Sequence, residues 1–221
     1  MLSKPEVTEE LRKELPPSFL CTYDHCQTGG IGIPGDFFIE HMETLKKHGI
    51  YEHLLLYEYI EGKEQIINTK IEILHKIFSV CNRATLRKLC EPMPDERSEY
   101  TVYRGSTEDR KLGISWTLCQ LHATHFAWCI NEGAGRLYET SVLAPDVLAF
   151  FGEYFNEKEL IFIPQSGNVS ELSISSEVRD LMNGYGDGGF YFPHPDIMPD
   201  SCKDCSNKIC LKLFQVSAVN P

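Results

Sequence analysis

The residues of this 221-residue chain with the clearest chemical potential lie in three short segments of its second half. In chain order these are Tyr103-Arg104-Gly105, Ser115-Trp116-Thr117 and Glu157-Lys158-Glu159. Arginine offers a planar, permanently charged set of donors for phosphate or hydroxyl groups. Residues two apart in an extended chain point to the same face, so the two glutamates are expected to project into one cleft. Carboxylates placed this way can stabilise positive charge that develops during a reaction.

These segments resemble, in their order and separation, the arginine, Ser-x-Ser/Thr and Glu-x-Glu elements of R-S-E mono-ADP-ribosyltransferases, the cholera-toxin-like group. The likeness spans residues 99–164 and includes the stretches GISWT, HFAW, RLYE, VLAFF and ELIFIP, which are similar to bacterial and phage effector-type members. The resemblance implies an α+β fold of two small, mainly antiparallel sheets around an NAD cleft. It does not extend to the N-terminal part of the chain, which would add a helical subregion.

The resemblance also implies roles for single residues. Glu159 would hold the nicotinamide-ribose hydroxyl and stabilise the sugar cation, and Glu157 would activate the acceptor. Ser115 would orient the catalytic glutamate, and Arg104 would anchor the phosphate or ribose of NAD. The other expected NAD-binding positions are their neighbours Tyr103, Gly105, Thr117 and Trp116. For Trp116, stacking on nicotinamide and filling the core both remain open.

The reaction implied is transfer of ADP-ribose from NAD, as co-substrate, to a protein side chain, with release of nicotinamide. One alternative is an NAD glycohydrolase toxin of the same fold, which would transfer the sugar to water. Another is a catalytically degenerate binding module whose helical half recruits a partner. Glu157 favours a protein acceptor, and the intact Arg104, Ser115 and Glu159 argue against the degenerate module. The acceptor protein and the type of residue modified stay open.

A second group of residues has the spacing of metal ligands. Cys202, Cys205 and Cys210, with His194 upstream, could complete a zinc site. Cys210, however, lies within an apolar run in which a cysteine would normally face the core. We therefore expect no metal, and we interpret His122 and His125, three residues apart on one predicted helix, as surface or groove histidines.

Composition narrows the partners and the compartment. The net charge of −11 disfavours binding to nucleic acid. No apolar run is long enough to cross a bilayer, and the charged N-terminus lacks the core of a secretory signal. Nine cysteines, an odd number, suit reduced thiols. We expect a cytoplasmic protein, or one delivered into the cytosol of a host or target cell as an effector.

The first part of the chain, residues 1–95, predicts a helical subregion. One helix is expected from a cap at Asp36 to a stop at Gly49. Three more are expected along residues 51–62, 67–81 and 84–90, where apolar residues recur at helical spacing.

The second part, residues 96–221, is the predicted catalytic region, and the alternative is that the two parts form one compact domain. Strands are expected at residues 101–105, 114–117, 136–143, 146–151, 159–164 and 209–219. A helix is expected at residues 119–130. Residues 167–199, rich in Gly, Ser, Asp and Pro, predict loops with one helix at 176–183.

Overall fold

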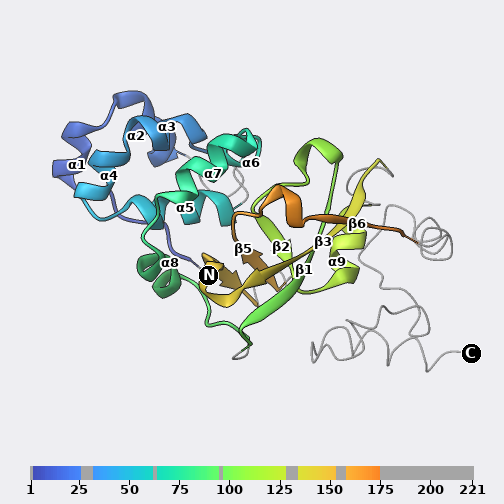
Figure 1. Ribbon diagram of the computed structural model, residues 1–221. Helices are drawn as coiled ribbons and strands as arrows, with labels where there is room; N and C mark the ends of the chain where they lie inside the picture. Colours follow the sequence, from blue (N-terminus) through green and yellow to red (C-terminus); the bar gives the residue numbers. More distant parts are fainter. Residues whose placement is uncertain are drawn as a thin grey trace, which may run out of the picture. The chain divides into compact units, whose positions relative to one another are not determined.

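The computed structural model describes residues 2–25, 32–61, 64–94, 97–127, 134–152 and 158–174. The chain divides into two compact units, Met1–Pro92 and Met93–Pro221 (Figure 1). The division lies close to residue 95, where the sequence pattern changes from helical to alternating. Helices make up the described elements of the first unit, and those of the second are a sheet, one α-helix and three short 3-10 turns. The predicted α+β class is confirmed.

The first unit contains eight short helices in its described residues. They are α1 (Glu9–Glu14), α2 (Pro17–His25), α3 (Gly35–Glu40), α4 (Met42–Lys47), α5 (Tyr51–Ile60), α6 (Glu64–Ile67), α7 (Ile71–Ser79) and α8 (Arg83–Leu89). The first two were not predicted. Thr8 caps α1 by accepting a hydrogen bond from the Leu11 amide, at 3.3 Å, so a cap signal preceded this charged segment.

Two predicted helices are each divided. The helix expected from Asp36 to Gly49 is α3 followed by α4, and Asp36 is not its cap, because Pro34 holds that position and Asp36 lies in the first turn. Gly49, with a φ of 70°, follows the end of α4 as predicted. The helix predicted at residues 67–81 is interrupted near its start, because α6 ends at Ile67 and α7 begins only at Ile71. There the Thr69 hydroxyl donates to the Gln65 carbonyl and accepts from the Gly35 amide.

Helix α5 is buried on nearly every side, including its two glutamates Glu52 and Glu58. A buried carboxylate is costly unless donors satisfy it. Here Glu52 accepts from the Asn82 amide at 2.8 Å, and Glu58 accepts from the Ile33 amide at 2.9 Å. Each glutamate therefore fixes the start of a helix distant in sequence, Ile33 just before α3 and Asn82 at the N-terminus of α8.

The cysteines of the first unit provide a test of its packing. Cys81 is buried, and burial raises the pKa of its thiol to about 12. At pH 8 its thiolate fraction is then on the order of 10⁻⁴. Cys21 on α2 is exposed. We expect iodoacetamide to alkylate Cys21 in the native protein and to leave Cys81 unmodified until denaturant is added, as read by peptide mass mapping. Equal labelling of the two in the native state would contradict the packing of α7 and α8.

The second unit is built on one antiparallel sheet with the strand order β4-β5-β2-β1-β3-β6 (Figure 1). The strands are β1 (Glu99–Ser106), β2 (Ser115–Thr117), β3 (Arg136–Leu143), β4 (Ala149–Phe151), β5 (Glu159–Ile161) and β6 (Ser170–Leu172). The expectation of two sheets differs from this arrangement. Strand β2 pairs with β1 on one side and with β5 on the other, so the described strands join into a single sheet.

The two faces of the sheet carry different residues. One face holds the larger apolar core, which consists of Tyr100, Val102, Trp116, Tyr138, Val142, Val147, Phe150, Leu160 and Phe162. On the other face, helix α9 (Gln120–His125) packs on β1 through Ala123, beside Tyr103 and Leu137. Side chains alternate between the faces along each strand. The predicted motifs are therefore split between the two faces.

The remaining predictions concern membrane spans and the C-terminal part of the chain. None of the helices described is long and apolar enough to cross a membrane. The helix expected at residues 176–183 and the strand expected at 209–219 lie outside the described residues. Strand β6 falls in a segment predicted to be loop. Its Ser170 and Glu171 have little tendency to form strands. The strand forms because it pairs with β3, a contact that the local sequence does not reveal.

Candidate functional site

The three predicted motifs lie on three adjacent strands, β5, β2 and β1. Tyr103 on β1 is opposite Thr117 on β2, and Thr117 is opposite Glu159 on β5. Paired residues in an antiparallel sheet point to the same face. This row therefore brings Glu159 to the face on which α9 packs, and Ser115, two residues before Thr117, lies on that face as well.

Ser115 and Glu159 contact each other directly. They are diagonal neighbours, because Ser115 is opposite Ile161 in the register, and the Ser115 side chain hydrogen-bonds the Glu159 carboxyl group. Burial raises the pKa of Glu159, while the hydrogen bond from Ser115 and the charge of Arg104 act in the opposite direction. Glu159 is thus hydrogen-bonded by Ser115 on its own face of the sheet and is affected only by the charge of Arg104, whose side chain leaves β1 on the opposite face, beside Tyr138.

Arg104 bridges β1 to β2 and to the segment between them. Its Nε donates to the carbonyl of Arg110 at 3.1 Å, and its Nη1 donates to the carbonyl of Ser115. The guanidinium lies against Gly113, where an added Cβ would come within 2.3 Å of Nη2. Two of its donor groups are therefore committed to the backbone. This geometry supports a positioning role for Arg104, and its predicted contact with NAD remains a prediction.

Lys158 precedes Glu159 with a φ of 49°, in the left-handed region that residues other than glycine seldom adopt. Its carbonyl accepts a hydrogen bond from the Leu118 amide at 3.2 Å. The entry to β5 is thus held in an uncommon conformation next to the half-buried carboxyl group of Glu159, and such conformations are concentrated at functional sites.

Thr117 and Tyr103 have local roles beside this site. The Thr117 hydroxyl accepts a hydrogen bond from the Cys119 amide at 2.9 Å, which shapes the turn into α9. Tyr103 is buried beneath α9 with Ala123 and Leu137. Their predicted contacts with NAD stay predictions.

Gly105 provides the close approach of α9 to the sheet. A Cβ at this position would lie 1.9 Å from the Ala123 carbonyl oxygen and 2.3 Å from the Ala127 nitrogen. The structure therefore gives Gly105 a packing role on the face where the sequence predicted NAD binding. No side chain can be added without moving the helix backbone.

Gly105→Ala is accordingly expected to destabilise the protein by about 1–3 kcal/mol or more, because the helix must shift to relieve the overlap. Thermal unfolding followed by circular dichroism measures this. Gly167→Ala is the matched control, since a Cβ there meets no atom within 4 Å. Equal melting temperatures for the two variants would contradict the packing of α9.

Trp116 belongs to the core. It is only 1% exposed, its Nε1 donates to the Gly113 carbonyl at 2.7 Å, and its ring packs against Phe162. Alternation along β2 points Trp116 to the face opposite Ser115 and Thr117. Of the two readings that the sequence left open, core packing fits this burial and stacking on nicotinamide does not.

Several predicted residues lie outside the part of the chain that the structure describes. These are Glu157 and the possible zinc ligands His194, Cys202, Cys205 and Cys210. Among the described residues no group of three or more potential ligands could hold a metal ion. His122 is buried on α9, whereas His125 is half-buried, and burial lowers the pKa of His125.

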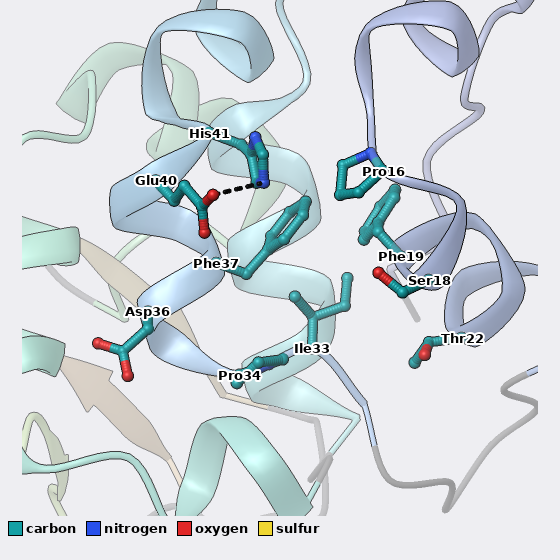
Figure 2. Close-up of a pocket in the computed structure, with 10 residues that line it drawn as sticks. All are labelled: Pro16, Ser18, Phe19, Thr22, Ile33, Pro34, Asp36, Phe37, Glu40 and His41. Carbon is teal, nitrogen blue, oxygen red and sulfur yellow. Dashed lines mark ion pairs between the residues drawn. The ribbon is translucent and has the colours of Figure 1, made fainter.

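A separate pocket of about 480 Å³ lies within the helical unit, between α2 and α3. Figure 2 shows the rings of Phe19 and Phe37 face to face at its centre, with Pro16, Ile33 and Pro34 around them. The two ring centroids are 4.4 Å apart and the rings are nearly parallel. This pocket was not predicted, because no sequence motif connects the segments that form its walls. None of its lining residues belongs to the predicted site.

No protein-family model matches the chain, and comparison with curated proteins and with solved structures gives no significant match.

Proposed function

We propose that the chain is an NAD-dependent mono-ADP-ribosyltransferase that modifies a protein side chain. The observation that supports this most is the connected set of Arg104, Ser115 and Glu159. The guanidinium binds the Ser115 carbonyl, and the Ser115 side chain binds the Glu159 carboxyl group. The three residues come from three strands and match, in order, the elements that the sequence motif predicted.

The donor set suits the chemistry proposed. Cleavage of the bond between nicotinamide and ribose leaves positive charge on the sugar as nicotinamide departs with the bonding electrons, and the acceptor forms the new bond and loses a proton. A carboxylate with a fixed orientation stabilises such charge in the transition state. Burial raises the pKa of Glu159, and the hydrogen bond from Ser115 and the positive charge of Arg104 act against this by favouring its ionised form. The hydrogen bond from Ser115 also orients the carboxyl group for this task. The site would act in a cytosol, either its own or that of a target cell.

Hydrolysis of NAD is the second candidate, because it would use the same residues with water as acceptor. The experiment that tests the proposal incubates the purified chain with NAD and a cell extract, and measures both nicotinamide release and labelling of proteins by mass spectrometry. Transfer predicts labelled proteins. Nicotinamide with only free ADP-ribose would favour the glycohydrolase, and unchanged NAD would contradict both.

Glu157 separates the two reactions. In the proposed mechanism it activates the protein acceptor, so Glu157→Gln should suppress labelling of the target at least about tenfold and leave slow hydrolysis largely intact. Nicotinamide production and target labelling are measured side by side. Loss of hydrolysis as complete as that of Glu159→Gln would contradict this division of roles.

A further inference from the structure

Three neighbouring side chains on one face of the sheet hold the segment between β1 and β2, residues 107–114. Tyr138 on β3 is directly opposite Arg104 on β1. Trp116 on β2 lies next to Arg104 on the other side, one residue beyond the Tyr103–Thr117 pair. The strand order β2-β1-β3 therefore places the three in one row.

Each member of this row donates one hydrogen bond to the segment above it. Trp116 Nε1 donates to the Gly113 carbonyl at 2.7 Å, and Arg104 Nε donates to the Arg110 carbonyl at 3.1 Å. Tyr138 Oη donates to the Glu108 carboxylate at 2.8 Å. The segment is thus fastened to the sheet at three points along its length, and Arg104 is the middle one.

The segment is also ordered from within. Glu108–Arg110 form a short 3-10 turn in which the Arg110 amide donates to the Thr107 carbonyl, and the Gly113 amide then donates to the Arg110 carbonyl. The Arg110 carbonyl therefore receives both the Gly113 amide and the Arg104 guanidinium. Any movement of this turn displaces the acceptor to which Arg104 is bound.

The Glu108–Tyr138 contact is the fastening point farthest from β2 and the one with the strongest acceptor. The ring of Tyr138 lies in the core, at 2% exposure, while its hydroxyl reaches the carboxylate. The hydrogen bonds from Lys111 and Tyr138 lower the pKa of Glu108, so the carboxylate is ionised at neutral pH. A hydrogen bond to an ionised acceptor is stronger than a neutral one.

We propose that the Glu108–Tyr138 hydrogen bond is a latch that holds residues 107–114 on the sheet and thereby positions Arg104, and through Arg104 the Ser115–Glu159 pair. Glu108 and Tyr138 are positioning residues on this account. The effect on catalysis rests on the proposed function, whereas the effect on Arg104 does not. Neither residue belongs to the motifs from which the site was predicted.

The test observes Arg104 itself. In protein labelled with ¹⁵N-arginine, the Nε–H signal of Arg104 is assigned by its loss in Arg104→Lys, and its exchange with solvent is measured by NMR. We expect exchange about tenfold faster or more in Tyr138→Phe and in Glu108→Ala. The double variant should show no further increase over Glu108→Ala, because that change already removes the bond from Tyr138 together with the contacts of Glu108 with Lys111 and Arg136.

Tyr51→Phe is the matched control, because it removes a buried tyrosine hydroxyl that donates to the Ile77 carbonyl in the helical unit. In this control variant, solvent exchange of the Arg104 Nε–H should stay within about twofold of the wild-type rate. Wild-type exchange in Glu108→Ala would overturn the latch. This variant changes a half-exposed side chain, so it decides the question even if Tyr138→Phe does not fold.

Activity separates the latch from the proposed function. If the wild type releases nicotinamide, the latch variants should lose about tenfold in kcat with little change in KM for NAD, since a small misplacement affects the transition state most. An equal fall for Tyr51→Phe would contradict the positioning role. If the wild type releases no nicotinamide while Arg104 exchange still responds to Tyr138→Phe, the latch stands and the proposed function fails.

Discussion

Replacing Glu159 by glutamine is expected to lower nicotinamide release by about 10³-fold or more. Glutamine keeps the shape and can still bond Ser115, but it removes the negative charge where positive charge develops on the sugar. The change acts on the step shared by transfer and hydrolysis, so both reactions should fall together. Initial rates of nicotinamide formation at saturating NAD measure the effect.

The stability of the same variant provides the control. Burial raises the pKa of Glu159 in the folded protein, so the folded state binds this proton more tightly than the unfolded chain does. The carboxyl group therefore contributes most stability at low pH, and that contribution is lost as pH rises through the raised pKa. Glu159→Gln should melt no lower than wild type at pH 7 and lose its rate nonetheless. Near wild-type rates would contradict the assignment of Glu159.

The raised pKa of Glu159 also determines how activity depends on pH in acid. The reaction needs the ionised carboxylate, and a raised pKa means that Glu159 takes up its proton at a higher pH than an ordinary glutamate does. Activity of the wild type should therefore fall, on acidification, before pH reaches the usual glutamate value of 4.5.

Changes at Arg104 should have the second largest effect. Arg104→Lys keeps the charge but cannot donate from two separated nitrogens, so the links to Arg110 and to Ser115 cannot both persist. We expect kcat/KM for NAD to fall about 100-fold, and Arg104→Ala to weaken NAD binding as measured by calorimetry.

The matched control for Arg104 is Arg12→Lys in the helical unit. Arg12 also donates from two nitrogens, to the Asp24 carboxylate at 2.8 and 2.7 Å. This control should leave kcat/KM unchanged. If Arg104→Lys is also unchanged with its fold intact, Arg104 neither positions the site nor anchors NAD.

Much of the fold follows from local patterns. Strand β3 coincides with the predicted run at residues 136–143, because an alternating, β-rich sequence leaves little choice. The helix boundaries were less accurate. His41 and Thr69 interrupt two predicted helices, and the hydroxyl contacts of Thr69 with Gly35 and Gln65 depend on tertiary structure.

The roles of the candidate site residues stay predictions, and the sequence located some of their positions better than others. Arg104, Ser115 and Glu159 were identifiable because their types and order carry the motif. Gly105 was assigned to ligand binding, yet its geometry shows helix packing, and Trp116 lies on the opposite face from its neighbours. Tyr138 and Glu108 were not found at all, since 30 positions separate them in sequence and only the sheet register brings them together.

The most direct measurement of the central claim is the mass balance of NAD consumption by the wild-type chain. Purified protein is incubated with NAD and a cell extract, with NMR detection of nicotinamide and mass spectrometry of the proteins. The proposed function predicts nicotinamide in an amount equal to the NAD lost, with ADP-ribose recovered on protein side chains, and neither product with Glu159→Gln. NAD that stays intact with the wild type, or nicotinamide formed equally by Glu159→Gln, would contradict it.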